Sequence, residues 1–121
     1  ALWPLLQKSA APKLVNISSI ASSITLLNGH MGAYGPSKAA LNWLTRSIHL
    51  QHEQLIAFAV HPGLVQTDMG AYAAKRIGLD WDKMETVEGS VGGILDVIDN
   101  ATREKTSGKL VSYKGGEEMP W

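Results

Sequence analysis

The chain has 121 residues, the size of one ordinary domain that can bury a core of its own. Its 11 basic and 11 acidic side chains balance and no run of lysine or arginine occurs, which argues against nucleic acid or a membrane surface as a partner. Because cysteine is absent, disulfides and thiolate metal sites are excluded; we predict no metal site and expect a reducing, cytoplasmic location.

The first part of the chain contains the pattern of a helix end and of a strand. Residues 1–10 (ALWPLLQKSA) have the composition of a helix end, in which Pro4 fits only within a first turn. Residues 13–19 (KLVNISS) form a short apolar run typical of a strand. A polar loop is then predicted to extend to Gly32.

A long helix is predicted from about Ala33 to His52. Three apolar residues recur in it at helical spacing and form the stripe expected to pack on a sheet: Leu41, Leu44 and Ile48. Three other residues lie off this stripe: Trp43, Ser47 and Leu50. The stripe is expected to face the core, which leaves Trp43 and Leu50 on another side of the helix.

Two further strands are predicted in the rest of the chain. Residues 55–60 (LIAFAV) are continuously apolar, as expected of a strand covered by helices on both faces. A weakly patterned segment then extends to Met84. Residues 109–113 (KLVSY) are predicted to form a third strand, and residues 114–121 a polar tail.

A second helix is predicted over residues 86–101, between the last two strands. Its apolar side is expected to be Val87, Val91, Ile94, Leu95 and Ile98. The adjacent Gly92 and Gly93 weaken this helix unless another segment packs close to them. Strand, helix, strand, helix, strand is the βαβαβ pattern, so we predict an α/β fold with a parallel sheet.

Two residues with complementary chemistry stand at the beginning of the long helix. Tyr34 and Lys38 are four residues apart, so a helix places both on one face, and Pro36 fits its first turn. An ammonium favours a nearby phenolate, by ~4 kcal/mol at ~4 Å and an effective dielectric of ~20. The pair could exchange protons near neutral pH as a general acid and base, although an ordinary helix-surface pair has the same spacing.

Two other segments are expected at the same edge of the sheet. Ser19 ends the first strand, and residues 61–67 (HPGLVQT) follow the second, where Pro62 and Gly63 leave main-chain groups free beside the Thr67 hydroxyl. Open α/β sheets bind ligands at the carboxyl ends of their strands. Taken singly, these features are a loop serine and a strand-exit turn. Taken together, they predict one site.

Three stretches, in this order, resemble the short-chain dehydrogenase/reductase family: NISSIASS, YGPSK and HPGLVQTDM. The family pattern is a serine after a strand, Y-x-x-x-K on the next helix and a P-G-x-V-x-T turn after the next strand. The resemblance covers nearly the whole chain and is strongest to fungal ketoreductases of the norsolorinic acid reductase kind and to carbonyl reductases. It implies a partial Rossmann-type, doubly wound parallel sheet, with residues 1–121 as the C-terminal half of one domain holding strands 5 to 7.

The resemblance also implies hydride transfer between a nicotinamide cofactor, NADP rather than NAD, and a ketone or secondary alcohol. In it Tyr34 gives a proton to the carbonyl oxygen, Lys38 holds the nicotinamide ribose and eases proton release from Tyr34, and Ser19 steadies the substrate oxygen. The cofactor-binding residues would be Tyr34, Lys38, Pro62, Gly63, Val65 and Thr67. A variable substrate lid would comprise residues 68–84, with help from Asn28, His30 and Met31.

The sequence also departs from the family. The glycine-rich phosphate loop has no counterpart, because the glycine pairs here lack its spacing and its strand-to-helix context. The residue that selects between NAD and NADP and the catalytic asparagine are absent too; Asn16 belongs to the strand. By the resemblance, the first strand predicted here would lack its partner on one side, which leaves an open edge. We therefore expect these 121 residues alone to bind dinucleotide poorly, and to be marginally folded or a homo-oligomer through the helix of residues 33–52.

Two functions remain open. The first is an oxidoreductase acting on a small-molecule carbonyl, seen here as its catalytic half. The alternative is a truncated, inactive chain that serves as a binding or dimerisation module through its long helix, for which Trp43 and Leu50 suit an interface. The retention of Ser19, Tyr34 and Lys38 favours the oxidoreductase.

Overall fold

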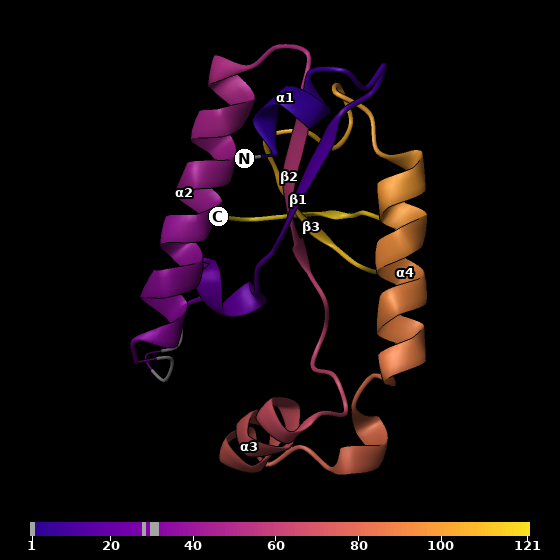
Figure 1. The fold of residues 1–121 in the computed structure, drawn as a ribbon. Helices are drawn as coiled ribbons and strands as arrows, with labels where there is room; N and C mark the ends of the chain where they lie inside the picture. The colour runs from indigo at the N-terminus through magenta and orange to yellow at the C-terminus, as the bar shows by residue number, and fades with distance from the viewer. Residues whose placement is uncertain (1, 28, 30–31) are drawn as a thin grey trace.

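A mostly parallel sheet forms the centre of the molecule (Figure 1). The computed structural model describes residues 2–27, 29 and 32–121, and within them the sheet has four strands in the order β1-β2-β3-β4. The strands are β1 (Lys13–Ile17), β2 (Ile56–His61), β3 (Leu110–Ser112) and β4 (Glu118–Met119). β2 pairs in parallel with β1 and with β3, which confirms the three predicted strands and their parallel arrangement.

The predicted polar tail was wrong in part. β4 pairs antiparallel with β3, Leu110 opposite Met119 and Val111 opposite Glu118. The Lys109 ammonium lies 2.7 Å from the Glu118 carboxylate across this pair. A strand of two residues carries no alternation that a sequence pattern could reveal, so only the tertiary structure makes it visible.

Helices cover both faces of the sheet, with α2 on one side and α4 on the other (Figure 1). The helices are α1 (Trp3–Leu6), α2 (Tyr34–Gln51), α3 (Asp68–Ile77) and α4 (Val87–Asn100), and two short 3₁₀ turns are η1 (Ile20–Ser22) and η2 (Trp81–Lys83). Pro4 lies in the first turn of α1, as expected. This layered arrangement is the predicted α/β, partial Rossmann-type fold.

Side-chain caps fix where two of the helices begin. The Thr67 hydroxyl accepts a hydrogen bond from the Gly70 amide at the start of α3, and the Thr86 hydroxyl accepts one from the Gly89 amide at the start of α4. Each bond satisfies an amide that has no partner within the helix. The weakly patterned segment up to Met84 thus contains a capped helix that its periodicity did not reveal.

The apolar core lies between the sheet and α4. It is the cluster of Phe58, Val60, Val97, Ala101, Val111 and Tyr113, against which Ile94 and Ile98 pack. Residues 57–60 of β2 are fully buried, as a strand covered on both faces requires. Gly93 allows the close contact of α4, because a Cβ there would lie 2.7 Å from the Tyr113 carbonyl oxygen.

The predicted packing face of α2 was wrong in part. Leu44 is 50% exposed, whereas the residues buried on α2 are Gly35, Asn42 and Thr45. The Asn16 amide donates to the Thr45 hydroxyl at 2.8 Å, and Asn42 is hydrogen-bonded to serines beyond β1. Polar contacts, which apolar spacing cannot register, therefore decide how this helix is rotated on the sheet.

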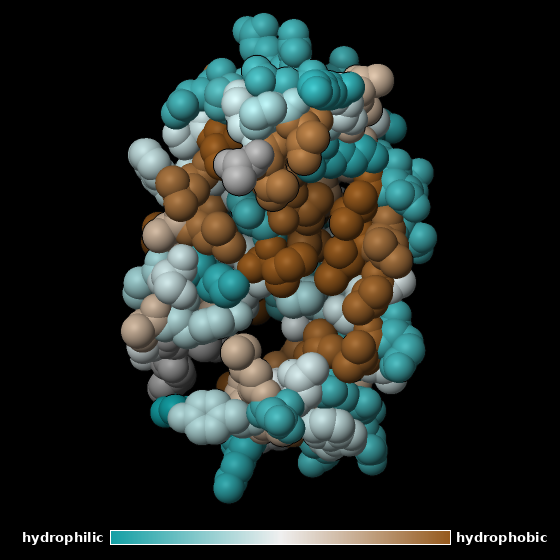
Figure 2. Space-filling view, in the orientation of Figure 1, coloured by the Kyte–Doolittle hydropathy of each residue, from teal (hydrophilic) through white to brown (hydrophobic). Residues whose placement is uncertain are grey.

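The predicted apolar side of α4 was also wrong in part. Ile94 and Ile98 pack on the core, but Val87, Val91 and Leu95 are exposed. Ser90 and Val97 are the buried residues of this helix. Figure 2 shows apolar surface over β1 and the near side of α4.

The open strand edge is confirmed within the described residues, where β1 pairs with β2 alone. In the same part of the chain, no helix combines the length and the apolar character needed to cross a membrane.

Candidate active site

Three segments named by the sequence meet at one end of the sheet. β1 and β2 run in parallel with Ile17 opposite Val60, so both strands end at the same edge. The beginning of α2, η1 and the segment that leaves β2 toward α3 all lie at this end (Figure 1). The Ser18 amide donates to the Val60 carbonyl at 2.8 Å and extends the pairing to the rim. The rim is therefore where a ligand would meet all three segments.

Tyr34 and Lys38 lie together in the first turns of α2. The Lys38 Nζ is 5.8 Å from the centre of the Tyr34 ring. The same ammonium donates at 2.9 Å to the carbonyl of Ile17, the last residue of β1. Tyr34 is 41% exposed. The helix start thus places a phenol and an ammonium beside the end of the first strand.

Ser19 lies directly after β1 and caps η1. Its hydroxyl oxygen accepts a hydrogen bond from the Ala21 amide at 3.1 Å, and its side chain is half-buried. A serine hydroxyl keeps a donor and a second lone pair after one such bond. Ser19 can therefore hold the turn and still offer a proton to a ligand oxygen.

The neighbouring Ser18 carries a buried network that the sequence analysis missed. Its hydroxyl donates to the Asn42 side-chain carbonyl at 2.6 Å, and the Asn42 amide donates to the Ser22 hydroxyl at 2.7 Å. Ser18, Ser22 and Asn42 are each almost fully buried. The network fastens the turn that carries Ser19 to α2, two turns beyond Tyr34. The available signal was an asparagine on the long helix together with a serine-rich strand end.

His61 is a second residue that the sequence analysis did not single out. It ends β2, and its Nδ1 accepts a hydrogen bond from the Ile20 amide at 3.2 Å. Burial lowers the pKa of His61, which favours the neutral ring that this acceptor role requires. The contact links the turn after β1 to the end of β2, so the two segments that border the rim are joined.

The four predicted cofactor-binding residues after β2 lie along one loop. Gly63 has a φ of +85°, a left-handed conformation that favours glycine. Val65 forms an isolated parallel bridge with Glu85. The Pro62 carbonyl accepts from the Ser90 hydroxyl at 2.7 Å, and Thr67 caps α3. The contacts with Glu85 and Ser90 hold this loop. The contacts of its residues with a cofactor stay a prediction.

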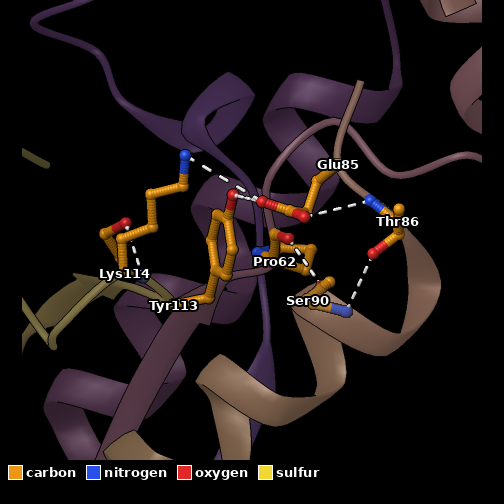
Figure 3. Close-up of polar contacts among 8 residues, drawn as sticks. Pro62, Glu85, Thr86, Ser90, Tyr113 and Lys114 are labelled. Carbon is orange, nitrogen blue, oxygen red and sulfur yellow. Dashed lines mark hydrogen bonds and ion pairs between the residues drawn. The ribbon is translucent and has the colours of Figure 1, made fainter. Parts of the chain in front are cut away.

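Figure 3 shows the polar cluster behind this loop. The Tyr113 hydroxyl donates to the Glu85 carboxylate, which also accepts from the Thr86 amide at 3.0 Å. The Lys114 ammonium lies 3.9 Å from the same carboxylate. The hydrogen bond from Tyr113 is the main cause that lowers the pKa of Glu85, and burial is the main cause that raises the pKa of Tyr113. At neutral pH Glu85 is therefore an anion and Tyr113 a neutral donor.

The predicted substrate lid contains α3 and η2. In Figure 1, α3 lies beyond the end of the sheet, on the side where the rim opens. Met69 and Tyr72 of α3 and Trp81 of η2 are exposed. Asn28, His30 and Met31, which were expected to help the lid, lie outside the described residues.

Two other kinds of binding site can be compared with this rim. A cavity of about 450 Å³ lies at the opposite end of the sheet, lined by α1 and by residues 52–55 at the end of α2. Over the residues that the structure describes, no three His, Cys, Asp or Glu side chains are grouped closely enough to hold a metal ion. None of the residues that line this cavity is a predicted site residue, and the segments that carry the predicted site residues meet at the rim instead.

The chain matches known proteins along its whole length. The sequence model of the family described as "short chain dehydrogenase" matches residues 1–77. A short-chain dehydrogenase of Pyricularia oryzae (RED3) is 42% identical, and the match covers 100% of this chain and 50% of that protein. The norsolorinic acid ketoreductase of Aspergillus parasiticus is 40% identical over 97% of this chain and 44% of its own length. The chain spans about half the length of the curated relatives it matches.

Solved structures agree with the sequence relatives. The NADPH-bound carbonyl reductase from chicken fatty liver superposes with a TM-score of 0.83 at 36% identity, over 98% of this chain and 49% of that one. The carbonyl reductase Sniffer of Drosophila melanogaster gives the same TM-score at 31% identity and the same coverage. With these relatives and the order of the three motifs along one sheet edge, the chain belongs to the short-chain dehydrogenase family.

Proposed function

We propose that this chain carries the catalytic residues of an NADPH-dependent reductase that converts a ketone into a secondary alcohol. Family membership supports oxidoreduction with a nicotinamide cofactor. The solved neighbours include a carbonyl reductase with NADPH bound and a short-chain dehydrogenase/reductase with NADP bound, and three of the relatives are named ketoreductases, which favours NADP and a carbonyl substrate. The substrate is a small molecule that enters at the carboxyl edge of the sheet.

Each catalytic residue has a distinct task in this proposal. Tyr34 Oη donates a proton to the carbonyl oxygen of the substrate while that oxygen gains negative charge. The Ser19 hydroxyl donates a hydrogen bond to the same oxygen and fixes its direction. Lys38 holds its ammonium against the Tyr34 ring and stabilises the phenolate that proton donation leaves. A bound reduced nicotinamide supplies the hydride.

The residues at the rim fit a nicotinamide ribose and carboxamide chemically. An ammonium has three donor hydrogens, and within the described residues Lys38 gives one of them, to the Ile17 carbonyl. The ribose hydroxyls are acceptors that the remaining donors can bind. The loop of Pro62, Gly63, Val65 and Thr67 would line the other side of the ring. The pyrophosphate is not assigned to any residue of this chain.

One observation carries the proposal most directly. The Lys38 ammonium joins Tyr34 to the end of β1, one residue short of the serine network and two short of Ser19. An ordinary pair of side chains on a helix surface does not require a hydrogen bond to the end of a parallel strand. The carboxyl ends of parallel strands are where open α/β sheets bind their ligands. This contact supports the proposal that Ser19, Tyr34 and Lys38 act on a common ligand.

The test is steady-state kinetics on the natural gene product that contains these residues. Tyr34→Phe is expected to lower kcat at least about a thousandfold, as loss of a general acid does, while the Kd for NADPH stays within about threefold. Ser19→Ala is expected to lower kcat by about a hundredfold, as loss of one oxyanion donor does. Ser47→Ala, an equal change on α2 away from the rim, should leave turnover intact. Full turnover by Tyr34→Phe would remove Tyr34 from the mechanism.

A second candidate function rests on the exposed side of α2. Trp43 is 70% and Leu50 65% exposed, and these apolar side chains lie away from the sheet-facing residues. We infer that this side of α2 binds a second copy of the chain, either beside catalysis or as the sole function of the chain. Sedimentation equilibrium checks this, because Trp43→Ser with Leu50→Ser should convert a dimer into a monomer. An unchanged mass would exclude this side of α2 as the interface.

A further inference from the structure

The loop after β2 has little secondary structure of its own, yet its main chain is bonded at three points. The Pro62 carbonyl accepts from the Ser90 hydroxyl at 2.7 Å. The Leu64 carbonyl accepts from the Glu85 amide at 2.9 Å, and the Gln66 amide donates to the Glu85 carbonyl at 2.8 Å. Alternate residues of the loop are thus held by α4 and by the segment that leads into it.

The ring of Tyr113 supports the same loop from behind. Gly63 lies so close to it that a Cβ at that position would be 2.8 Å from the Tyr113 Cε1 atom. Tyr113 is itself buried in the core cluster with Val97 and Val111. The ring therefore forms a rigid surface, and the loop can approach it only because residue 63 is glycine.

The carboxylate of Glu85 joins these two supports. It accepts from the Tyr113 hydroxyl and from the Thr86 amide, and it lies 3.9 Å from the Lys114 ammonium (Figure 3). Its side chain is only 25% exposed. The residue whose main chain binds Leu64 and Gln66 is thus anchored through its side chain to the ring that packs on Gly63.

We propose that Tyr113, Glu85 and Ser90 are positioning residues for the nicotinamide cofactor. Together they set the backbone of the loop that carries Pro62, Gly63 and Val65, without touching the cofactor themselves. The inference rests on the proposed function, since it needs that loop to line the cofactor. A main chain held at alternate residues presents a preformed surface, so the ligand does not have to order the loop on binding.

The experiment measures loop order and cofactor use separately, on the natural gene product that contains this chain. The variants are Tyr113→Phe, which keeps the ring against Gly63, Glu85→Gln and Ser90→Ala. Glu88→Gln is the matched control, because Glu88 lies exposed in the first turn of α4. Hydrogen exchange of the Gln66 amide, without cofactor, reports the order of the loop. KM for NADPH and kcat report its use.

Tyr113→Phe and Glu85→Gln are each expected to speed exchange of the Gln66 amide about tenfold and to raise KM for NADPH about tenfold, with kcat within about threefold. The double variant should be no worse than either single one, because the two residues act through one bond. Ser90→Ala should have a smaller effect of the same kind. Glu88→Gln should resemble the wild type in both measurements.

Three results would overturn the inference in different ways. If exchange of the Gln66 amide is unchanged in both variants, the Tyr113–Glu85 bond does not hold the loop. If exchange rises while KM for NADPH stays at the wild-type value, the bond serves folding alone. A wild-type protein with no turnover or binding of NADPH would refute the proposed function and the positioning role together, and the exchange data would then still show whether the loop is held.

Discussion

The helices on the two faces of the sheet are held by different kinds of interaction. On the α4 face, apolar side chains of β2, β3 and α4 form the core cluster that includes Phe58 and Val97. On the α2 face, the buried helix residues are Gly35, Asn42 and Thr45, and hydrogen bonds add to the packing of the helix on the sheet. The α4 face is therefore held mainly by non-directional apolar packing, and the α2 face also by directional hydrogen bonds.

This division matches where the predicted chemistry lies. Ser19, Tyr34 and Lys38 all belong to the α2 face, where buried hydrogen bonds permit one arrangement of strand end, turn and helix. Apolar packing is non-directional and would tolerate sliding of the helix, whereas a hydrogen-bonded serine and asparagine would not. A site that needs a phenol and a hydroxyl at fixed positions benefits from the more directional attachment.

The largest effect is expected in the apolar core. Phe58 is fully buried on β2, and Phe58→Ala should lower the free energy of unfolding by about 3–5 kcal/mol through lost burial and the cavity it leaves. Phe58→Leu, which leaves a smaller cavity, should lose about 1–1.5 kcal/mol. Guanidinium unfolding of the natural gene product measures both. A loss near zero for Phe58→Ala would show that the α4 face does not dominate stability.

The second effect tests the polar face. Asn42→Leu keeps the size of the side chain but removes the acceptor for Ser18 and the donor to Ser22, and should cost about 2 kcal/mol because buried hydroxyls lose their partners. Asn100→Leu is the matched control, since Asn100 is exposed at the end of α4 and should change stability by less than about 0.5 kcal/mol. Urea unfolding followed by circular dichroism gives both values, and a stabilised Asn42→Leu would contradict this account of α2.

The third effect concerns the far end of α2. The Arg103 guanidinium donates to three main-chain carbonyls there, those of His49, His52 and Leu55, at 2.7, 3.0 and 2.6 Å. The bond to His49 satisfies a carbonyl in the last turn of α2, which a helix end leaves without a partner, and the positive charge favours the carboxyl end of the helix dipole. Arg103→Met should cost about 1.5–2 kcal/mol.

Arg103→Lys separates the two contributions at that helix end. It keeps the charge but not the planar fork that reaches several carbonyls, so it should recover about half of the loss caused by Arg103→Met. Thermal unfolding of the two variants side by side makes the comparison. Equal stability of both would mean that the hydrogen-bond geometry, and not the charge, accounts for the whole contribution.

Much of the fold could be predicted because it depends on local patterns. The apolar run of residues 55–60 and the helix of residues 33–52 were found within about a residue of β2 and α2, since strand burial and helical spacing are properties of neighbouring residues. The rotation of α2 could not be found this way. It depends on Asn16, 29 residues before Thr45, and such a contact leaves no period in the sequence.

The same distinction applies to the candidate site. Tyr34 and Lys38 could be paired from their spacing alone, because one turn of helix brings them together. His61 was overlooked, as its role depends on an amide 41 residues away, and so were Glu85 and Tyr113, which are 28 residues apart. Residues that position a site through the tertiary structure become visible only when the chain is folded.

The smallest effect is a pH dependence that distinguishes the Glu85 cluster from the rest of the molecule. The Tyr113 hydrogen bond lowers the pKa of Glu85 in the folded protein below its ordinary value of 4.5, so in that range the unfolded chain binds more protons. The stabilisation by this carboxylate is therefore complete above pH 4.5 and is lost as the pH falls through the folded pKa.

His61 and His49, whose pKa values burial lowers, also reduce stability as the pH falls, from about 6.5 downward. The difference in unfolding free energy between the wild type and Glu85→Gln removes these shared contributions. This difference should be constant from pH 6 to pH 5 and should shrink toward pH 3, and a difference that grows on acidification would mean that Tyr113 does not stabilise the ionised form of Glu85.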